Sequence, residues 1–371
     1  MIREYRFPQL EKVIFGAGAL DRVPAELDRW GRRRALILTG STLSTRTTLV
    51  KRLERTLGAR WAGTCNGIRQ HVPSGTVQAA LARAREVRAD ALVAFGGGSP
   101  IDAAKIVAQE LLEDGQTQAD MPQIAISTTL SAGEFTPFAG ITDEATRVKG
   151  LRADARICPR TVVLDPEVTL PTPRQLWAAT GVKALDHAIE ALWSVNPQPV
   201  SDALAMEAIR RLRRHLPDSI ADTDDMDARG ECQIAAWMSI FGMANVGVRL
   251  SHVLGHQIGA RWDVPHGVTS CITLPHCMRY LAPRTLRQQG LIAEALGIQV
   301  RGRDPEAVAA DAADAVEAFI RQLDLPARLR NVGAREDELP DVAREVAAER
   351  PSLREAPDGE AALLALLRQM W

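Results

Sequence analysis

Four of the chain's seven histidines lie between His252 and His276. His252 and His256 are four residues apart, and His266 follows ten residues later. Residues four apart on a helix share a face, so His252 and His256 would point the same way. Imidazole binds divalent metals and transfers protons near neutral pH. The cluster therefore predicts a site built around a divalent ion or a reacting carbonyl group.

A second candidate segment runs from Gly181 to Glu190 and carries Lys183 and His187. These two residues are also four apart, so a helix over this segment would present them on one polar face. Histidines from two helices and a loop would then meet in one place. A single histidine is more often a hydrogen-bonded structural residue. That interpretation is given to His71, His215 and His276.

A glycine-rich turn joins an apolar run, Ala91–Phe95, to a helical pattern. Its three consecutive glycines, at 96–98, let a ligand approach the backbone closely. We predict Ser99 as the helix N-cap, Pro100 as the first helical residue and Asp102 as the partner in a capping box. The free N–H groups at the start of such a helix suit a pyrophosphate. The spacing is neither G-x-G-x-x-G nor that of a P-loop, and a purely structural turn is the alternative.

A loop rich in small hydroxyl residues, Thr128–Thr136, follows the apolar run Gln123–Ser127. Sheets of α/β proteins bind ligands at the carboxyl ends of their strands. The loop is therefore a second candidate for ligand binding, with a solvated loop as the alternative.

Short apolar runs alternate with helical patterns in the first part of the chain, which is typical of buried parallel strands with helical crossovers. The predicted strands are 35–39, 91–95, 123–127 and 161–165. After the proline-rich step at 170–173 the strand signal ends. The predicted helices there are 182–193, 202–216, 230–254, 305–323 and 359–370. We therefore predict an α/β nucleotide-binding domain over 1–171, a helical domain over 172–371 and a substrate cleft between them.

Composition narrows the class of protein. The 371 residues carry 45 basic and 46 acidic side chains, which argues against a general nucleic-acid or membrane binder. The five cysteines are scattered without a C-x-x-C pair, as in a reducing cytosol. The start has no apolar signal region, and no apolar run approaches the about 20 residues that span a bilayer. We expect a cytoplasmic protein that binds a small molecule.

Five segments carry a resemblance to a known family. They are FGGGSPIDAAK (95–105), FAGITDE (138–144), VVLDPEVTLPTP (162–173), ATGVKALDHAIEAL (179–192) and LSHVLGHQIGARWDVPHGVTSCITLPHCMRY (250–280). Through them the chain resembles the iron-containing alcohol dehydrogenase superfamily over nearly its whole length. That superfamily includes maleylacetate reductases and, more distantly, glycerol dehydrogenase and dehydroquinate synthase.

The resemblance implies the dehydroquinate synthase-like architecture, with an NAD(P)-binding α/β domain followed by a helical domain. It implies an enzyme, commonly a homodimer, that interconverts a carbonyl (an aldehyde, ketone or keto acid) and an alcohol by hydride transfer from NAD(P)H in the cleft. The predicted cofactor-binding residues are Gly40, Gly96, Gly97, Gly98, Ser99, Asp102, Thr128, Thr129 and Ser131.

Metal-dependent members of the superfamily hold Fe²⁺ or Zn²⁺ with one aspartate and three histidines. By the resemblance, the three histidines correspond to His187, His252 and His266. His256 corresponds to a histidine near the nicotinamide that handles substrate or proton. The aspartate position holds Lys183. We predict Lys183 and His256 as the catalytic residues.

Two signals point to different branches of the superfamily. The loop Thr128–Thr136 is one residue shorter than the usual alcohol dehydrogenase pattern and matches maleylacetate reductases, in which the aspartate is typically asparagine and no metal is required. The step Pro265-His266-Gly267 matches the metal-dependent branch instead. Whether a metal binds is therefore open at this point.

Lys183 weighs against a metal on electrostatic grounds. An ammonium about 4 Å from a divalent ion is repelled by roughly 8 kcal/mol at an effective dielectric constant of 20. Our hypothesis is that the Lys183 ammonium replaces the metal by polarising the substrate carbonyl. One alternative is an i, i+3 salt bridge with Asp186 on a helix surface, which would contribute little. Another is zinc held by three histidines alone, with Lys183 pointing away.

Cofactor and substrate leave further alternatives. The stretch Thr39–Thr42 lacks the acid that relatives preferring NAD often carry after the second strand, so we expect tolerance of NADPH, with Arg46 or Arg33 near the 2′-phosphate. A maleylacetate-like substrate would need cationic residues, whereas a simple aldehyde would need an apolar pocket. The competing functions are a dehydroquinate synthase-like lyase that uses NAD transiently and a non-catalytic nucleotide-binding protein.

Overall fold

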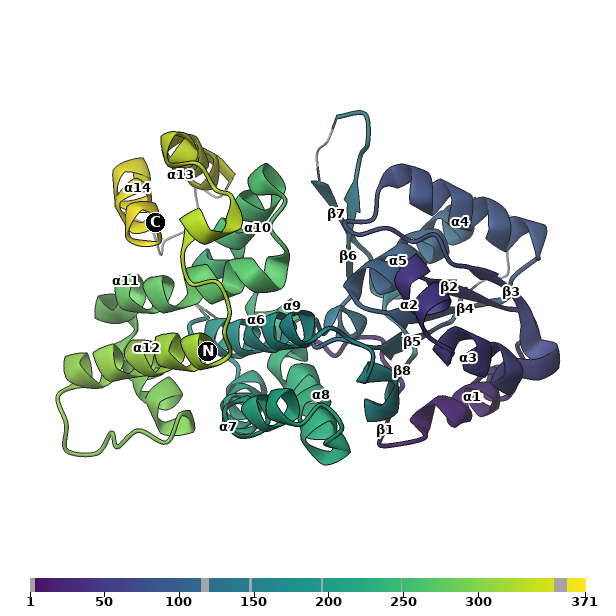
Figure 1. Ribbon diagram of the computed structural model, residues 1–371, viewed down its shortest axis with the longest axis horizontal. Helices are drawn as coiled ribbons and strands as arrows, with labels where there is room; N and C mark the ends of the chain where they lie inside the picture. Colours follow the sequence, from purple (N-terminus) through teal and green to yellow (C-terminus); the bar gives the residue numbers. More distant parts are fainter. Residues whose placement is uncertain (1–3, 115–119, 147–148, 195, 248, 350–358) are drawn as a thin grey trace. The chain divides into compact units, whose positions relative to one another are not determined.

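The computed structural model describes the chain except residues 1–3, 115–119, 147–148, 195, 248 and 350–358 (Figure 1). The chain forms two compact units. The first comprises Met1–Thr172 and Thr223–Trp237, and the second comprises Pro173–Asp222 and Met238–Trp371. The predicted domains are 1–171 and 172–371. That prediction does not assign residues 223–237 to the first unit.

The first unit is built on a six-stranded parallel sheet with the strand order β1-β8-β5-β4-β2-β3. The strands are β1 Lys12–Phe15, β2 Ala35–Thr39, β3 Trp61–Cys65, β4 Ala91–Gly96, β5 Gln123–Ser127 and β8 Thr161–Leu164. The four predicted strands are confirmed, and they occupy the centre of the sheet. The sequence analysis missed β1 and β3, which are the two edge strands and are only partly buried. A separate antiparallel hairpin joins β6 Phe138–Thr142 to β7 Lys149–Ala153.

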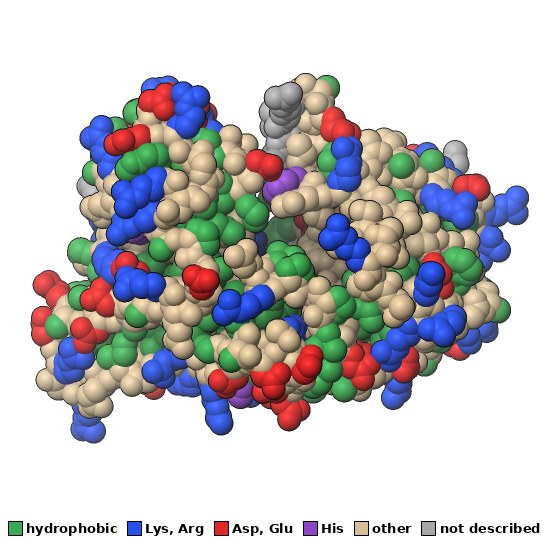
Figure 2. Space-filling view, viewed as in Figure 1, with side chains coloured by type: hydrophobic (Ala, Val, Ile, Leu, Met, Phe, Trp, Pro, Cys, Tyr) green, Lys and Arg blue, Asp and Glu red, His purple; other side chains and the backbone are tan. Residues whose placement is uncertain are grey.

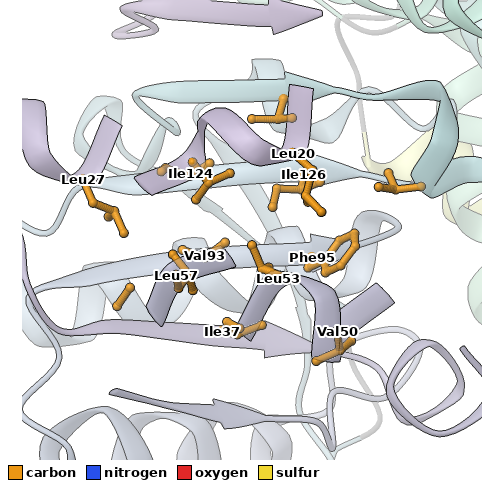
Figure 3. Close-up of a cluster of buried hydrophobic side chains, with 14 of the residues drawn as sticks. Leu20, Leu27, Ile37, Val50, Leu53, Leu57, Val93, Phe95, Ile124 and Ile126 are labelled. Atoms are coloured by element: carbon orange, nitrogen blue, oxygen red, sulfur yellow. The ribbon is translucent and has the colours of Figure 1, made fainter. Parts of the chain in front are cut away.

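Helices cover the sheet and bury its apolar side chains. They are α1 Val23–Arg29, α2 Ser41–Arg46, α3 Leu49–Leu57, α4 Ser74–Glu86 and α5 Gly98–Glu113. Leucines of α1 and α3, with Leu20 before α1, pack on alternate residues of β2, β4 and β5, and Figure 3 shows this cluster. Every residue of these three strands is buried, which explains why they lack a polar alternation in the sequence.

Helix α8, Met226–Ile240, supplies the returning segment of the first unit. The guanidinium of Arg229, which is 1% exposed, donates to the carbonyl and the hydroxyl of Thr169 at 3.1 and 3.0 Å. At the end of the segment the Trp237 ring stacks on Phe135 with centroids 5.9 Å apart. Residues far along the chain therefore complete the packing of the α/β unit.

The second unit is helical, as predicted. Its further helices are α6 Arg174–Leu192, α7 Pro199–Ala221, α9 Met243–Val246, α10 Leu250–Trp262, α11 His266–Ala295, α12 Pro305–Gln322, α13 Leu339–Glu349 and α14 Gly359–Gln369. The single helix predicted over 230–254 is wrong: the chain breaks there into α8, α9 and α10. The breaks contain Gly242 and Gly247, and Gly247 has a φ of +73°, which helices do not accommodate.

No single described helix is long and apolar enough to cross a membrane, although one bent pair, Met226–Val246 with Leu250–Trp262, meets the same test by length and composition. On the face drawn in Figure 2, Lys and Arg side chains are interspersed with Asp and Glu. This mixture matches the near-zero net charge of the sequence.

Candidate active site

The glycine turn closes the carboxyl end of β4. Gly96 has a φ of +147°, and a Cβ there would lie 2.9 Å from Pro100 Cγ, so only glycine fits. Helix α5 begins at Gly98 with Gly97 as its N-cap and no side-chain cap bond. The predicted N-cap Ser99 is therefore wrong. Gly97 and Gly98 have no Cβ atoms, and they allow the helix to begin before Ser99. Asp102 makes no capping box; its carboxylate accepts from the backbone N–H of Gly140 at 3.0 Å.

The hydroxyl-rich loop lies directly against this turn. A Cβ on Gly97 would meet Thr129 Cγ2 at 3.2 Å, and one on Gly98 would meet Ser131 Oγ at 3.5 Å. The backbone N–H of Thr128 donates to the carbonyl of Gly96 at 2.9 Å. Since β2 neighbours β4 in the sheet, Gly40 follows at the same carboxyl edge. The structure thus groups the predicted cofactor-binding residues at one edge of the first unit.

Lys105 holds the loop that follows. Its ammonium is completely buried and donates to the carbonyls of Gly133 and Phe138 at 2.6 and 2.7 Å, and to Thr136 Oγ1 at 3.3 Å. Burial lowers the pKa of Lys105, and the nearby Asp102 carboxylate opposes that change. The sequence gives no sign of this contact, because two of the three acceptors are backbone carbonyls.

Glu134 lies in the same loop and is 1% exposed. Loss of solvent raises the pKa of this carboxyl to about 7, despite hydrogen bonds from its own backbone and Ser127 and the charge of Lys105. Glu134 therefore binds its proton more tightly in the folded protein than in the unfolded chain.

Glutamate 134 should make the protein less stable at alkaline pH. Its stabilising contribution is full below the unfolded pKa near 4.5 and is lost as the pH rises through 7, a change of about 3 kcal/mol. We expect Glu134→Gln to remove this loss, so that the melting temperature of the variant falls less than that of wild type between pH 5 and pH 8. The exposed Glu144, whose pKa Arg69 lowers, is the control as Glu144→Gln. Parallel pH curves for wild type and Glu134→Gln would contradict the prediction.

An open pocket of about 650 Å³ lies beside α2 and α3. Hydroxyl side chains and two cations contribute to its wall, and its lining residues are Ser44, Thr45, Arg46, Thr47, Thr48, Leu49, Lys51, Glu167, Leu170 and Pro171. Arg33, the other predicted phosphate contact, precedes β2 and bonds Asp28 at 2.7 Å. Arg46 therefore remains the candidate, because it lies beyond the carboxyl end of β2.

The second unit brings the predicted histidines together. The ring centroids of His187 on α6 and His252 on α10 are 4.9 Å apart, and those of His252 and His266 are 5.2 Å apart. His256 lies 4.8 Å from His266 by the same measure. His187 and His252 are buried, whereas His256 is exposed. His266 opens α11 rather than lying in a loop, so three helices position the cluster.

Lys183 lies beside the buried pair of rings. It is half-buried, one turn before His187 on α6. Burial, His252 and Lys183 together lower the pKa of His187, and Lys183 also counteracts the raised pKa of His252. The charge of Lys183 therefore lowers the proton affinity of both rings. The alternative of a surface salt bridge with Asp186 does not hold, because Asp186 is completely buried.

Two buried carboxylates, which the sequence analysis did not select as site residues, support His252. Glu190 Oε1 accepts the backbone N–H of His252 at 3.1 Å, and its Oε2 accepts that of Arg249 at 2.9 Å. His252 Nδ1 lies 2.8 Å from Glu190 Oε2 and 3.7 Å from Asp186 Oδ2. The hydroxyl of Ser251 donates to the same Asp186 oxygen at 3.0 Å. The signal that could have found them is the i, i+4 spacing of two acids on the helix that also carries Lys183 and His187.

These carboxylates set the local proton affinities. Burial and the neighbouring Glu190 raise the pKa of Asp186 to about 7. Burial alone would lower the pKa of His252, but the charges of Glu190 and Asp186 outweigh it and raise that pKa. His252 thus lies against two carboxylates, and its ring is closer to Glu190 than to Asp186.

Comparison with known proteins identifies the family. Residues 10–166 match the iron-containing alcohol dehydrogenase model, and residues 177–368 match the C-terminal model of the Fe-containing alcohol dehydrogenase family. The chain therefore belongs to the iron-containing alcohol dehydrogenase family, and it is an NAD(P)H-dependent oxidoreductase. The two-domain fold expected from the resemblance is confirmed.

Among its relatives, a maleylacetate reductase of Sphingobium indicum is 36% identical over 79% of this chain and 78% of its own length. Another, from Pseudomonas knackmussii, is 32% identical over 100% of this chain and 97% of its own. The crystal structure of a maleylacetate reductase from Agrobacterium tumefaciens has a TM-score of 0.86 at 28% identity, covering 100% of this chain and 99% of that one. These relatives do not favour the lyase alternative.

The family name implies iron, and the side chains present do not fit it. Among the described residues, the one group of three whose ligand atoms lie within 4.8 Å of one another is Asp186, Glu190 and His252, rather than three histidines. Both Glu190 oxygens already accept backbone N–H groups. The charge of Lys183 acts on the same rings. A divalent ion bound by this group would have to displace these bonds and overcome that charge.

Proposed function

We propose that the chain uses NADH or NADPH to reduce a carbonyl compound that bears carboxylate groups, of the maleylacetate kind. The observation that carries this proposal is the positive charge of Lys183 beside the histidine rings. A fixed cation attracts a carboxylate or a developing oxyanion, whereas a simple aldehyde needs an apolar wall. The names of the relatives agree with this chemistry.

The proposed roles divide between the two units. In the first, the N–H groups of the glycine turn, with Gly40, Ser99, Thr128, Thr129 and Ser131, bind the dinucleotide phosphates and sugars, and Asp102 fixes the neighbouring hairpin. In the second, Lys183 binds the substrate oxygen. His256, the exposed histidine of the cluster, donates the proton. Reduced nicotinamide, when bound, would supply the hydride; Lys183 would stabilise the electron pair displaced onto the substrate oxygen, and the His256 proton would complete the product.

A reductase assay tests the proposed function. Oxidation of NADH or NADPH would be followed at 340 nm with maleylacetate, with neutral aldehydes and ketones of similar size, and with monocarboxylic keto acids. We expect kcat/KM for the dicarboxylate to exceed that for the neutral compounds by about 100-fold, which is two to three kcal/mol of differential binding. Preference for neutral aldehydes, or cofactor binding without turnover of any compound, would contradict the proposal.

The pocket beside α2 predicts that NADPH is accepted. Replacing Arg46 with alanine should lower kcat/KM for NADPH by about 10-fold and leave that for NADH unchanged, because an exposed cation contributes roughly one kcal/mol to binding a phosphate. Arg33→Ala is the matched control, since Arg33 pairs with Asp28 before β2. If Arg46→Ala affects both cofactors equally, the pocket does not bind the 2′-phosphate.

We also propose that the protein works in the cytoplasm as a homodimer. None of the five cysteines, all within the described residues, forms a disulfide, which agrees with a reducing compartment. Light scattering coupled to size-exclusion chromatography measures the oligomeric state directly, and a monomer mass near 40.4 kDa would contradict the dimer.

A further inference from the structure

The polar cluster on α6 combines a half-buried lysine with two buried carboxylates. Lys183, Asp186 and Glu190 come from one face of α6, and His252 and Ser251 face them from α10. Thr273 of α11 closes the group through a 2.8 Å contact with the Ser251 hydroxyl. Asp186, Glu190 and His252 are 0%, 0% and 3% exposed. Water therefore contributes little to screening of these charges.

We propose that the Lys183 ammonium takes the place of the family's metal: it is the fixed positive charge that stabilises the oxyanion. This inference rests on the proposed reductase function. It assigns Lys183 as a catalytic residue and Asp186 as a positioning residue.

The contacts of the two carboxylates support the exchange. Both Glu190 oxygens accept backbone N–H groups, and the Asp186 carboxylate accepts the Ser251 hydroxyl. An ion added at this face of α6 would have to replace these bonds and would also meet the positive charge of Lys183.

The geometry explains how the lysine is held. The Asp186 carboxylate accepts from Ser251, and the Glu190 carboxylate accepts two backbone N–H groups at the start of α10. These bonds fix α10 against α6 and so hold His252 beside His187. Lys183, one turn before His187 on the same helix, lies near both rings and extends from a rigid base.

The proposed reduction needs no reactant besides NAD(P)H, the carbonyl substrate and a proton. Hydride from NAD(P)H forms the new C–H bond, and the π electrons of the carbonyl, or of a double bond conjugated with it, move to oxygen. The Lys183 ammonium stabilises that oxyanion without giving up its proton. His256 then supplies the proton that completes the product, and NAD(P)⁺ leaves.

Lysine 183 variants test the proposal. Lys183→Met removes the charge while keeping the length of the side chain, and we expect kcat to fall about 100- to 1,000-fold with KM for the nicotinamide cofactor unchanged. Lys183→Arg keeps the charge and should retain activity within about tenfold of wild type. Lys12→Met, the same change at a partly exposed lysine of the first unit, is the control. Full activity of Lys183→Met would overturn the proposal.

Metal binding gives a readout that does not depend on turnover. Wild-type protein dialysed against a chelator should contain far less than one metal per chain and keep its reductase activity. Lys183→Asp should gain affinity for Co²⁺, seen as new visible absorption on titration, because it exchanges a repelling cation for a ligand. One tightly held metal per wild-type chain would overturn the proposal. If no substrate is turned over, the proposed function fails, while the Co²⁺ titration still tests the role of Lys183.

Discussion

Lys105→Met is expected to lower the free energy of unfolding by about 1–3 kcal/mol and to weaken dinucleotide binding at least tenfold. The change keeps the volume of the side chain but removes the Lys105 donor from the buried carbonyl of Phe138, whereas the carbonyl of Gly133 keeps the backbone N–H and the hydroxyl of Thr136. Each buried polar group that loses its partner costs about 1–3 kcal/mol. The affected loop continues from Thr129 and Ser131, which lie against the glycine turn. Urea unfolding and titration of NADH fluorescence would measure the two effects.

The matched control is Lys12→Met. The exposed Lys12 side chain pairs with the buried Glu26, which keeps two other donors in Arg29 and the Thr161 hydroxyl. We expect this variant to lose well under 1 kcal/mol. If Lys105→Met is as stable as Lys12→Met and binds NADH normally, then Lys105 does not hold the loop.

Gly267→Ala is expected to destabilise the second unit by about 1–2 kcal/mol and to reduce activity. A Cβ on Gly267 would lie 2.7 Å from the carbonyl oxygen of Ala179 and 2.8 Å from its carbon. Both are backbone atoms of α6, so α11 and α6 would have to separate. Overpacking of this kind costs roughly 1–3 kcal/mol or more, which outweighs the about 1 kcal/mol by which alanine favours a helix. Because His266 is the preceding residue, the separation would also displace the histidine cluster.

Gly230→Ala provides the comparison for this variant. Gly230 also lies within a helix, α8, but a Cβ there meets nothing within 4 Å. This control should be as stable as wild type or slightly more so. Thermal unfolding of both variants, read with reductase activity, checks the prediction; equal melting temperatures would show that α6 and α11 tolerate the methyl group.

The central strands could be predicted from sequence because burial on both faces leaves a continuous apolar run, as in β2, β4 and β5. The edge strands β1 and β3 are short and partly exposed, so their composition resembles that of a loop. The predicted capping box failed for a different reason. Propensity favours Ser99 as a cap, but the glycines before it allowed α5 to begin at Gly98.

The histidine cluster was predictable because the i, i+4 spacing puts side chains on one face of a helix. Its supporting carboxylates were harder to identify, because the main partners of Glu190 are backbone N–H groups at the start of α10. Almost every residue has a backbone N–H group, so no particular residue type in the sequence marks such a donor. The same holds for Lys105, whose acceptors are carbonyls brought close only by the fold.

The return of residues 223–237 to the first unit has a consequence for synthesis of the chain. A nascent polypeptide that has left the ribosome only as far as Thr172 lacks Arg229 and Trp237, which bond Thr169 and cover Phe135. The α/β unit therefore completes its folding only after the first helices of the other unit have been made. A cut at Thr172 would yield an amino-terminal fragment with an exposed Phe135 and a Thr169 that lacks its Arg229 donor, so the two halves are expected to be inseparable as expression products.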